Sequence, residues 1–575
     1  MSHARVLVFL FCAARGVGGL LVAHDGHARR VAAASAQLAA SSSSCQSSGV
    51  KIVRSGSNRV PNGAAYKKAS RRLDLSDMSS VLEVRADASP CVVVEPMCSM
   101  EKLVRATMAK GLLPKVVPEF KEITVGGAIM GGAMESSSHR HGMFHDTVQA
   151  AECLLANGTI VVASRAAEHS ELLAYLGGSY GTLCVLTAAT IECERAFPYV
   201  HLRLRWYDEV DDGLEALVRA AQSPNAAAFI DGVVLPAPAS GYLLVQGTFV
   251  EEEEPGSGKG QDGAVAAAVA AGGAQLLTAG ARPWDEWFYE FLQRAGERLS
   301  AVPAAAEETY TMSTQDYLFR FDRGAFNFAS AGTWMSSWRD FVHPTKLPLY
   351  LASANAPLPR AAFGWFFATA VWQPILHLAP PAAIASQFVL QDCFVPAASA
   401  AAGVAAARRA ASGHLPAAAC PIWTWPVRGA SSPLAPNGHR AGELFVNLGI
   451  YSRCADGSAA EVTRRLEAWV TANGGRKLLY SNNYYWLEPS SSTRRREGEP
   501  ETAAGDRSRM RSRADLWKVG GYGREGYDAM RLAYGAEGVL PRLEDKVLTG
   551  AEAELGVGPG AEEVAWDVRL ARFLL

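Results

Sequence analysis

The chain has 575 residues, of which 49% are hydrophobic and 19% charged, and its 55 Lys+Arg nearly balance its 57 Asp+Glu. This length exceeds what a single hydrophobic core usually supports, so two to three domains are expected. The balanced charge excludes the strongly basic surface that is typical of nucleic-acid-binding proteins. No nucleic-acid partner is therefore predicted.

The cysteines carry no metal-binding or disulfide pattern. The chain has 10 cysteines, and they form no Cys-x-x-Cys pair and no His/Cys cluster at zinc spacing. This distribution favours a reducing compartment and predicts no metal site.

The N-terminus is ambiguous. Residues 6–23 are apolar but interrupted by Arg15, whereas a membrane span needs about 20 consecutive apolar residues. A membrane anchor, a cleaved signal peptide and a disordered terminus remain open as alternatives. Residues 24–48, rich in Ala and Ser, are expected to be a linker or a poorly ordered lead-in.

Strand-like and helix-like segments alternate along the rest of the chain, which indicates an α+β protein. An Asn-Gly pair within residues 150–163 predicts a hairpin turn. The predicted strands are residues 92–96, 150–155, 159–163, 182–191, 200–206 and 242–250, and the predicted helices are residues 99–110, 214–222, 284–298 and 397–412.

Residues 124–142 carry the most informative pattern. They read Thr-Val-Gly-Gly-Ala-Ile-Met-Gly-Gly-Ala-Met-Glu-Ser-Ser-Ser-His-Arg-His-Gly. Glycine lets a backbone approach a ligand closely, and exposed backbone N–H groups and serine hydroxyls bind anions. The segment is therefore predicted to be a loop that holds the pyrophosphate of a dinucleotide. The pattern is not the G-x-G-x-x-G of a Rossmann site, and a plain glycine-rich turn is the alternative.

This segment and its flanks resemble a known family. The order of elements is similar to the FAD-binding domain of the vanillyl-alcohol oxidase/p-cresol methylhydroxylase (PCMH) superfamily. Pro118-Glu119 followed by T-V-G-G-x-I-M-G-G-x-x-E-S-S-S-H-x-x-G resembles the delta(24)-sterol reductase (Diminuto/seladin-like) family. Further segments that match in family order are residues 316–326, 363–365, 391–396, 421–423, 444–449, 479–484, 515–517 and 527–547.

The resemblance implies an α+β fold in which a two-subdomain FAD-binding domain of the PCMH type carries an α+β substrate-capping domain. Residues 1–48 would form the anchor and linker, 49–197 the FAD-binding domain and 198–475 the cap. Residues 476–575 would return to the flavin and substrate site, with a basic insertion at 490–513 that is most simply disordered.

The implied activity is reduction of the 24(25) double bond of a sterol side chain by FAD with NADPH as hydride donor. FAD is expected to be non-covalent, because residues 52–62 contain no histidine. Deletion of residues 1–45 is expected to leave FAD binding intact, because this segment lies outside the predicted core. The predicted cofactor-binding residues are Thr124, Val125, Gly126, Gly127, Ala128, Ile129, Met130, Gly131, Gly132, Ala133, Met134, Glu135, Ser136, Ser137, Ser138, His139, Gly142 and Gly181.

The predicted catalytic residues are Tyr317, Arg320, Arg323 and Tyr484, since a tyrosine hydroxyl held by a guanidinium can relay a proton. A structural salt bridge of the arginines with Asp316 or Asp322 is the alternative. For His139, a hydrogen bond that braces the loop is favoured over proton transfer. The aromatic residues considered as substrate walls are Tyr480, Tyr484, Tyr485, Trp486, Trp423 and Trp425.

The resemblance also implies an endoplasmic-reticulum membrane location with the active domain facing the cytosol, and a sterol and a membrane surface as partners. The apolar residues 361–379 are expected to form a buried helix or an interfacial surface.

A sugar or alcohol oxidoreductase of the same superfamily and a non-enzymatic sterol-binding protein are the competing functions. Neither the oligomeric state nor the proton donor follows from the sequence.

Overall fold

The fold is known from a computed structural model, which describes residues 25–42, 49–53, 70–165, 168–250, 275–302, 307–326, 357–376, 381–414, 421–430, 432–454, 456–485, 516–517 and 520–548. The expected anchor (6–23), the first flavin loop (54–60), the acidic loop 251–260 and the basic insertion 490–513 lie outside the described residues.

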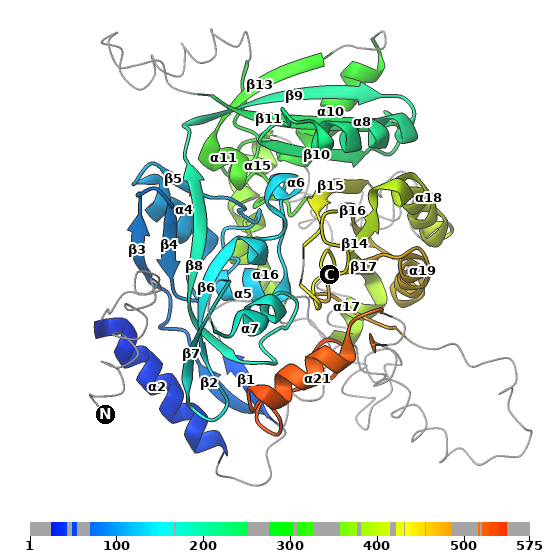
Figure 1. The fold of residues 1–575 in the computed structure, drawn as a ribbon. Coiled ribbons are helices and arrows are strands. Elements are labelled where there is room, and N and C mark those ends of the chain that lie inside the picture. The colour runs from blue at the N-terminus through cyan, green and yellow to red at the C-terminus, as the bar shows by residue number, and fades with distance from the viewer. Residues whose placement is uncertain are drawn as a thin grey trace, which may run out of the picture.

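Three sheets organise the described chain (Figure 1). A small parallel pair contains β1 (Val50–Val53) and β2 (Arg71–Asp74). A six-stranded sheet contains β3 (Val81–Arg85), β4 (Cys91–Val94), β5 (Leu112–Pro114), β6 (Val148–Leu154), β7 (Ile160–Ser164) and β8 (Val185–Arg195). A nine-stranded sheet contains β9 (Tyr199–Tyr207), β10 (Phe229–Val234), β11 (Tyr242–Val250), β12 (Gln275–Leu276), β13 (Glu307–Ser313), β14 (Phe388–Pro396), β15 (Ile422–Arg428), β16 (Leu444–Arg453) and β17 (Arg476–Lys477).

The six-stranded sheet is built around β8, which pairs antiparallel with β4, β5 and β6. Most of β8 is buried, as expected for an apolar strand covered on both faces. β6 and β7 form the hairpin that the Asn157-Gly158 turn predicts, and Gly158 has the positive φ of 84° that such a turn requires. The strand predictions in this region are confirmed.

The nine-stranded sheet has the order β12-β13-β9-β11-β10-β15-β16-β14-β17. Its strands β9 and β11 pair in register along their whole length, from Tyr199 opposite Val250 to Tyr207 opposite Tyr242. In Figure 1 this sheet curves from the top of the molecule to its right side, beside the six-stranded sheet. The two sheets therefore face a common central region.

Helices cover the sheets. Beside the six-stranded sheet lie α4 (Met100–Met108), α5 (Val125–Gly131), α6 (Ser138–His141), η1 (Phe144–Thr147) and α7 (Ser170–Leu176). The cap contributes α8 (Val210–Gln222), α10 (Phe288–Ser300), α11 (Thr314–Leu318), α15 (Pro357–Phe363), η2 (Gly364–Phe367), α16 (Thr369–Leu376), α17 (Pro381–Gln387), η3 (Ala397–Ser399), α18 (Ala400–Ala411) and α19 (Ala459–Ala472). The C-terminal helices are α21 (Arg524–Ala533) and α22 (Leu543–Val547).

The helix predictions for residues 99–110, 214–222, 284–298 and 397–412 are confirmed by α4, α8, α10 and η3 with α18. The apolar segment 361–379 is not one helix: it is divided among α15, η2 and α16, and Pro374 lies inside α16. Proline removes a helical hydrogen bond and restricts the preceding residue, which accounts for a short helix here.

Only residues 196–198 separate β8, in the six-stranded sheet, from β9, in the nine-stranded sheet. The last strand of the cap sheet, β17, begins at Arg476 and pairs with β14. The C-terminal segment then returns to the six-stranded sheet. There the guanidinium of Arg531 donates to the carbonyl oxygen of Thr182, just before β8. The domain boundaries at 48, 197 and 475 stay a prediction.

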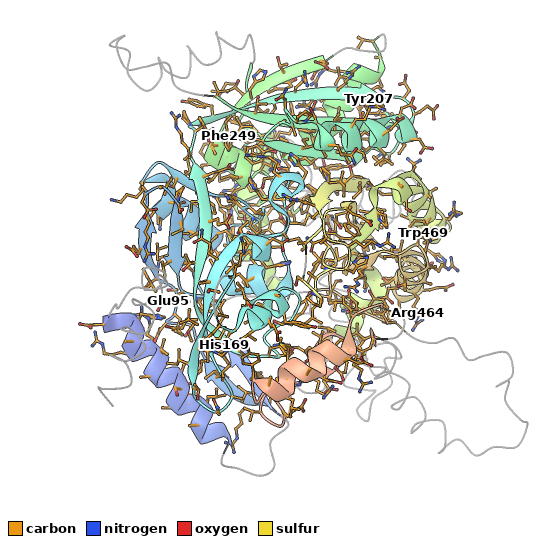
Figure 2. All side chains as sticks on the ribbon, in the orientation of Figure 1. Glu95, His169, Tyr207, Phe249, Arg464 and Trp469 are labelled. Atoms are coloured by element: carbon orange, nitrogen blue, oxygen red, sulfur yellow. The ribbon has the colours of Figure 1, made fainter. Side chains whose placement is uncertain are left out.

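The expectation of a linker at residues 24–48 is wrong for its central part, which forms α2 (Asp25–Ser42). Val31, Ala34 and Leu38 of α2 are buried in a small core with β1 and β2. His27 Nδ1 lies 2.7 Å from Glu95 Oε1 and its Nε2 lies 3.1 Å from Glu152 Oε1; Figure 2 shows Glu95 where α2 meets the sheet.

Burial opposes the charge on His27, but the hydrogen bonds that its ring donates to Glu152 and Glu95, together with their charges, outweigh burial and raise its pKa to about 9. Alanine has the highest helix propensity, so the composition itself was compatible with a helix. The sequence could not show the pairing of His27 with Glu95 and Glu152, which lie far away along the chain. A deletion of residues 1–45 would remove α2 and expose its partners. The premise that this segment lies outside the core is therefore wrong, and retention of FAD after the deletion stays a prediction.

Within the part of the chain that the structure describes, no helix has both the length and the apolar composition that a membrane crossing requires.

Candidate active site

The glycine-rich segment is a short helix at its start, not the open loop expected from the sequence. Thr124 caps α5, and its hydroxyl accepts a hydrogen bond from the backbone N–H of Gly127 at 3.2 Å. Thr124 also bridges to Ser99 at the start of α4. Because helical N–H groups bond within the helix, only part of this backbone can serve an anion.

The predicted cofactor residues divide into two faces. Val125, Ala128 and Ile129 are in the main core, and a Cβ on Gly126 would lie 2.8 Å from Pro96 Cβ. These residues therefore hold α5 against β4. The partly accessible residues of the segment before Glu135 are Thr124, Gly127, Gly131, Gly132 and Ala133. Of the cofactor residues predicted on α5 and just after it, these are available to a ligand, whereas the buried Met130 and Met134 pack inward.

The residues beside this face fit a dinucleotide. A Cβ on Gly131 would meet only Tyr180 Cε1, at 3.7 Å. The turn at residues 178–181 has positive φ at Gly178, Tyr180 and Gly181, and Tyr180 N–H donates to the carbonyl of Met130 at 2.8 Å. Small residues thus bring two backbone segments together. Gly178, Ser179 and Gly181 are buried, and the accessible face lies at Gly131 and Tyr180, where a cofactor could approach closely.

A cation lies at the same place. The ammonium nitrogen of Lys546 in α22 is 3.7 Å from the position of a Cβ on Gly181. A lysine beside glycine backbone can attract a pyrophosphate as a point charge. The sequence reasoning missed Lys546, because no spacing links it to residues 124–142. The residues that would hold FAD are thus the accessible part of α5, the 178–181 turn and Lys546.

Ser136 and His139 of the segment contact the cap, whereas Ser137 donates to the carbonyl of Lys115 and Ser138 accepts from the backbone N–H of Glu135. The backbone N–H of Ile230 in β10 donates to the carbonyl of Ser136 at 2.9 Å. His139 places its two ring nitrogens 2.9 Å from the carbonyl oxygen of Ser136 and 3.0 Å from that of Ala227. Burial lowers the pKa of His139 to about 4. His139 therefore braces two segments as a neutral ring. Ser137 and Ser138 are likewise buried, and Gly142 packs against Asp146.

Arg320 forms a buried ion triad across the two sheets. Its Nη2 lies 3.1 Å from Glu135 Oε1 and 2.6 Å from Asp231 Oδ2, and its side chain has an exposed fraction of 0%. Burial raises the pKa of Asp231 to about 6 against the opposing effect of Arg320. Of the two readings of Arg320, the salt bridge exists, but its partners are Glu135 and Asp231 instead of Asp316 or Asp322.

Tyr317 joins this triad. Its hydroxyl lies 3.0 Å from Ser136 Oγ, and the guanidinium of Arg320 lies over its ring, 4.1 Å from the centroid. The pKa of Tyr317 is raised well above 10, mainly by burial. Tyr317 therefore holds its proton and contributes a neutral hydroxyl.

The other two predicted catalytic residues lie in different contacts. Arg323 Nη1 donates to the carbonyl of Gly364 at 3.3 Å. Tyr484 is buried, its N–H donates to Glu467 of α19 and its hydroxyl donates to the carbonyl of Ala385 at 3.4 Å. The structure thus brings Tyr317 and Arg320 together with Glu135 and Ser136, and it places Tyr484 beside α17 and α19 instead. Their catalytic roles stay predictions.

A second acidic group lies on β14. Asp392 is 5% exposed and accepts hydrogen bonds from Asn447 Nδ2, Tyr451 and Tyr480 at 2.8, 2.8 and 2.9 Å. Burial raises the pKa of this carboxyl. A carboxylate within the largely apolar residues 388–396 is the sequence feature that could have predicted this group.

Glu119 lies close to both acidic groups. Burial, followed by the charge of Glu135, raises its pKa to about 8, and Asp392 adds to the effect while Arg320 opposes it. Its side chain nevertheless keeps some accessible surface, as does Tyr480. Both residues are therefore only partly covered by protein. Glu119 was quoted in the sequence motif but not recognised as a candidate for chemistry.

Aromatic rings pack beside this acidic region. The ring centroid of Phe326 lies 5.3 Å from that of Trp423, 5.7 Å from that of Trp425 and 5.0 Å from that of Tyr451. Trp423 and Trp425 are 1% exposed. Of the predicted aromatic walls, these two and Tyr480 are in this region, and Trp486 lies outside the described residues.

Comparison with known proteins agrees with this arrangement. Residues 28–164 match the family model of an FAD binding domain. The chain is 35% identical to the delta(24)-sterol reductase of Arabidopsis thaliana over 199 residues, which cover 33% of this chain and 34% of that protein. It is 24% identical to that of Mus musculus over 499 residues (84% of this chain, 79% of that protein) and 26% identical to that of Homo sapiens over 437 residues (73% and 72%). The chain therefore contains an FAD binding domain and is similar to delta(24)-sterol reductases over most of its length.

Proposed function

We propose that this protein is an FAD-dependent reductase of the 24(25) double bond of a sterol side chain, with NADPH as the hydride donor. The similarity to delta(24)-sterol reductases over 84% of the chain carries the proposal. The structure supports it with an accessible glycine face for the cofactor, enclosed acids and neighbouring aromatic rings. A fold alone would not assign the chemistry.

The enclosed region suits the reduction of an isolated alkene. Such an alkene accepts a hydride poorly, so a proton must reach carbon 24 before or while a hydride reaches carbon 25, where a tertiary cation is favoured. FAD, when bound, supplies the hydride chemistry. The chain must supply an acid and exclude water. The buried rings of Phe326, Trp423 and Trp425 make the surroundings of these acids apolar, and aromatic faces stabilise a desolvated cation by up to about 2 kcal/mol.

The test is reduction of a sterol with an unsaturated side chain by the purified, FAD-loaded protein and NADPH. Mass spectrometry should show the saturated product. Deuteride from labelled NADPH should appear at carbon 25, and a solvent deuteron at carbon 24 when the reaction runs in deuterium oxide. The same sterol with a saturated side chain is the matched control and should remain unchanged.

Two outcomes would contradict this function. An FAD-loaded preparation that reduces no sterol but consumes oxygen with a sugar or polyol would establish the alcohol oxidoreductase instead. A protein that binds the sterol without any turnover would establish the binding function.

We propose, as a separate point, that the protein sits at the endoplasmic-reticulum membrane with its folded part facing the cytosol. The apolar residues 6–23 support this location. Exposed apolar side chains on the cap also support contact with a membrane surface. Trp284, Leu358 and Trp365 have exposed fractions of 55%, 84% and 55%, and Arg360 Nε donates to the carbonyl of Trp284, which ties α15 to the loop before α10.

A fusion with a C-terminal fluorescent tag should label the endoplasmic reticulum and resist extraction by alkaline carbonate. Deletion of residues 1–24, which ends before α2 and so leaves the His27 contacts in place, should release the protein into the carbonate extract with FAD retained. Protease should remove the tag from intact microsomes. Complete extraction of the full-length protein would contradict a membrane anchor.

A further inference from the structure

We propose that Glu119 is the general acid that protonates carbon 24 of the substrate alkene. This inference rests on the proposed function and assigns the proton donor within it. The argument begins with the position of Glu119 in the loop between β5 and α5, where the FAD-binding domain meets the cap.

The loop is clamped to the cap on the C-terminal side of Glu119. The backbone N–H of Lys121 donates to Asp322 Oδ1 at 3.0 Å. The ring of Phe120 packs edge-on against Phe326, with centroids 5.6 Å apart, and Phe326 stacks on Tyr451. Glu119 is therefore held next to the aromatic cluster and the residues around Asp392.

The charged and titratable groups that act on Glu119 come from both domains. Glu135 and Asp392 disfavour its ionised form, and Arg320 favours it. Tyr451 and Tyr480 in turn respond to the charge of Glu119. With burial as the largest effect, the pKa of about 8 keeps Glu119 protonated near neutral pH. A general acid works best when its pKa is close to the working pH.

The Glu119 carboxyl is also uncommitted. Among the described residues, it hydrogen-bonds to its own backbone amide, and no side chain of the described segments donates to it or pairs with it. It is partly accessible although enclosed. A neutral acid with an uncovered face can approach a substrate.

The neighbouring groups are poorer donors. Arg320 is engaged with Glu135 and Asp231. The Asp392 carboxylate already accepts three hydrogen bonds. The hydroxyls of Tyr451 and Tyr480 both donate to Asp392, and burial beside that carboxylate raises their pKa values well above 10. These tyrosines hold their protons, so within the described site Glu119 is the group suited to release one.

The proposed step is balanced as follows. The O–H bond of Glu119 breaks, and the π electrons of the alkene form a C–H bond at carbon 24 with that proton. Carbon 25 becomes electron-deficient and accepts a hydride, which carries two electrons, from the reduced cofactor. Glu119 is left as a carboxylate and recovers a proton from water after the product leaves. The alkene is reduced and the hydride donor is oxidised.

The deciding variants are Glu119→Gln, which keeps the shape but cannot release a proton, and Glu119→Asp, which keeps the acid. Glu122→Gln is the matched control, because Glu122 is in the same loop and exposed. Glu119→Gln should retain one FAD per chain and the wild-type rate of flavin bleaching by NADPH. Its sterol reduction should fall by about 100-fold or more, in line with the usual contribution of a general acid. Glu119→Asp should recover part of the rate.

The pH dependence gives a second readout. Wild-type turnover should fall as pH rises through about 8, because the acid is then ionised, and the residual turnover of Glu119→Gln should lack this fall. A carboxyl with a raised folded-state pKa makes the protein progressively less stable between its unfolded and folded pKa values. Glu119→Gln should therefore raise the melting temperature at pH 8 but not at pH 4.5.

Two results separate the two proposals. If the wild type reduces the sterol and Glu119→Gln keeps its rate or the same pH profile, the role of Glu119 is overturned and the function stands. If the FAD-loaded wild type reduces no sterol, the proposed function itself is overturned.

Discussion

Replacing Arg320 by methionine is expected to destabilise the protein by about 3–5 kcal/mol, the usual cost of removing one partner from a buried ion pair. Arg320 is fully buried, and its loss would leave Glu135 and Asp231 facing each other without a cation. Ser136, the residue after Glu135, also accepts a hydrogen bond from the backbone N–H of Ile230 in β10, close to this ion triad. Urea unfolding monitored by tryptophan fluorescence, with and without added FAD, measures the effect.

Arg323→Met is the matched control, because Arg323 is partly buried and donates only to a backbone carbonyl among the described residues. Its destabilisation should be at most about 1 kcal/mol, the net worth of a typical hydrogen bond. Adding Asp231→Asn to Arg320→Met should restore part of the lost stability, since one of the two repelling charges is then removed. An Arg320→Met variant with unchanged stability and lost turnover would instead support the catalytic role predicted from the sequence.

Much of the fold could be predicted because its signals are local. The Asn157-Gly158 turn between two apolar runs indicated β6 and β7, and the apolar periodicity of residues 214–222 indicated α8. Helix α2 escaped prediction because its stability depends on tertiary contacts, above all His27 with Glu95 and Glu152. Nothing in an alanine-rich segment reveals a partner so far away along the chain.

The orientation of the glycine-rich segment 124–142 also depends on tertiary contacts that its sequence does not reveal. The composition of the segment predicted small residues beside a cofactor, but the sequence could not say which side of each residue is accessible to a ligand. The structure shows that α5 is helical, so that Gly126 faces Pro96 and Gly131 faces accessible space. A loop of exposed N–H groups was expected because glycine is a poor helix former, and packing against β4 overrides that preference.

The chemistry-bearing residues were only partly predictable. Tyr317 and Arg320 are close together on one helical turn, and the structure confirms that they contact each other. Asp231, which pairs with Arg320, comes from a strand about ninety residues earlier, and Glu119 and Asp392 come from two other parts of the chain. Burial raises the pKa of Glu119, and burial is a property of the folded protein.

Replacing Gly131 by valine is expected to abolish FAD binding while the protein still folds. A Cβ at this position would meet no protein atom closer than Tyr180 Cε1 at 3.7 Å, so the substitution fits the protein. The valine methyl groups would instead fill the accessible space beside α5. FAD affinity should fall by about 100-fold or more, which corresponds to about 2.7 kcal/mol. Fluorescence titration of the refilled apoprotein measures this loss, and circular dichroism verifies the fold.

Valine substitutions at two other glycines serve as controls for Gly131→Val. Gly523→Val should keep wild-type FAD affinity, because Gly523 is exposed, has an ordinary φ of −77° and has no heavy atom within 4 Å of the added Cβ. Gly126→Val should impair folding itself, because its Cβ would lie 2.8 Å from that of Pro96. Loss of FAD in a folded Gly131→Val variant, with binding retained in Gly523→Val, therefore isolates contact with the cofactor from damage to the fold. One FAD per chain in purified Gly131→Val would show that the cofactor does not approach this face of α5.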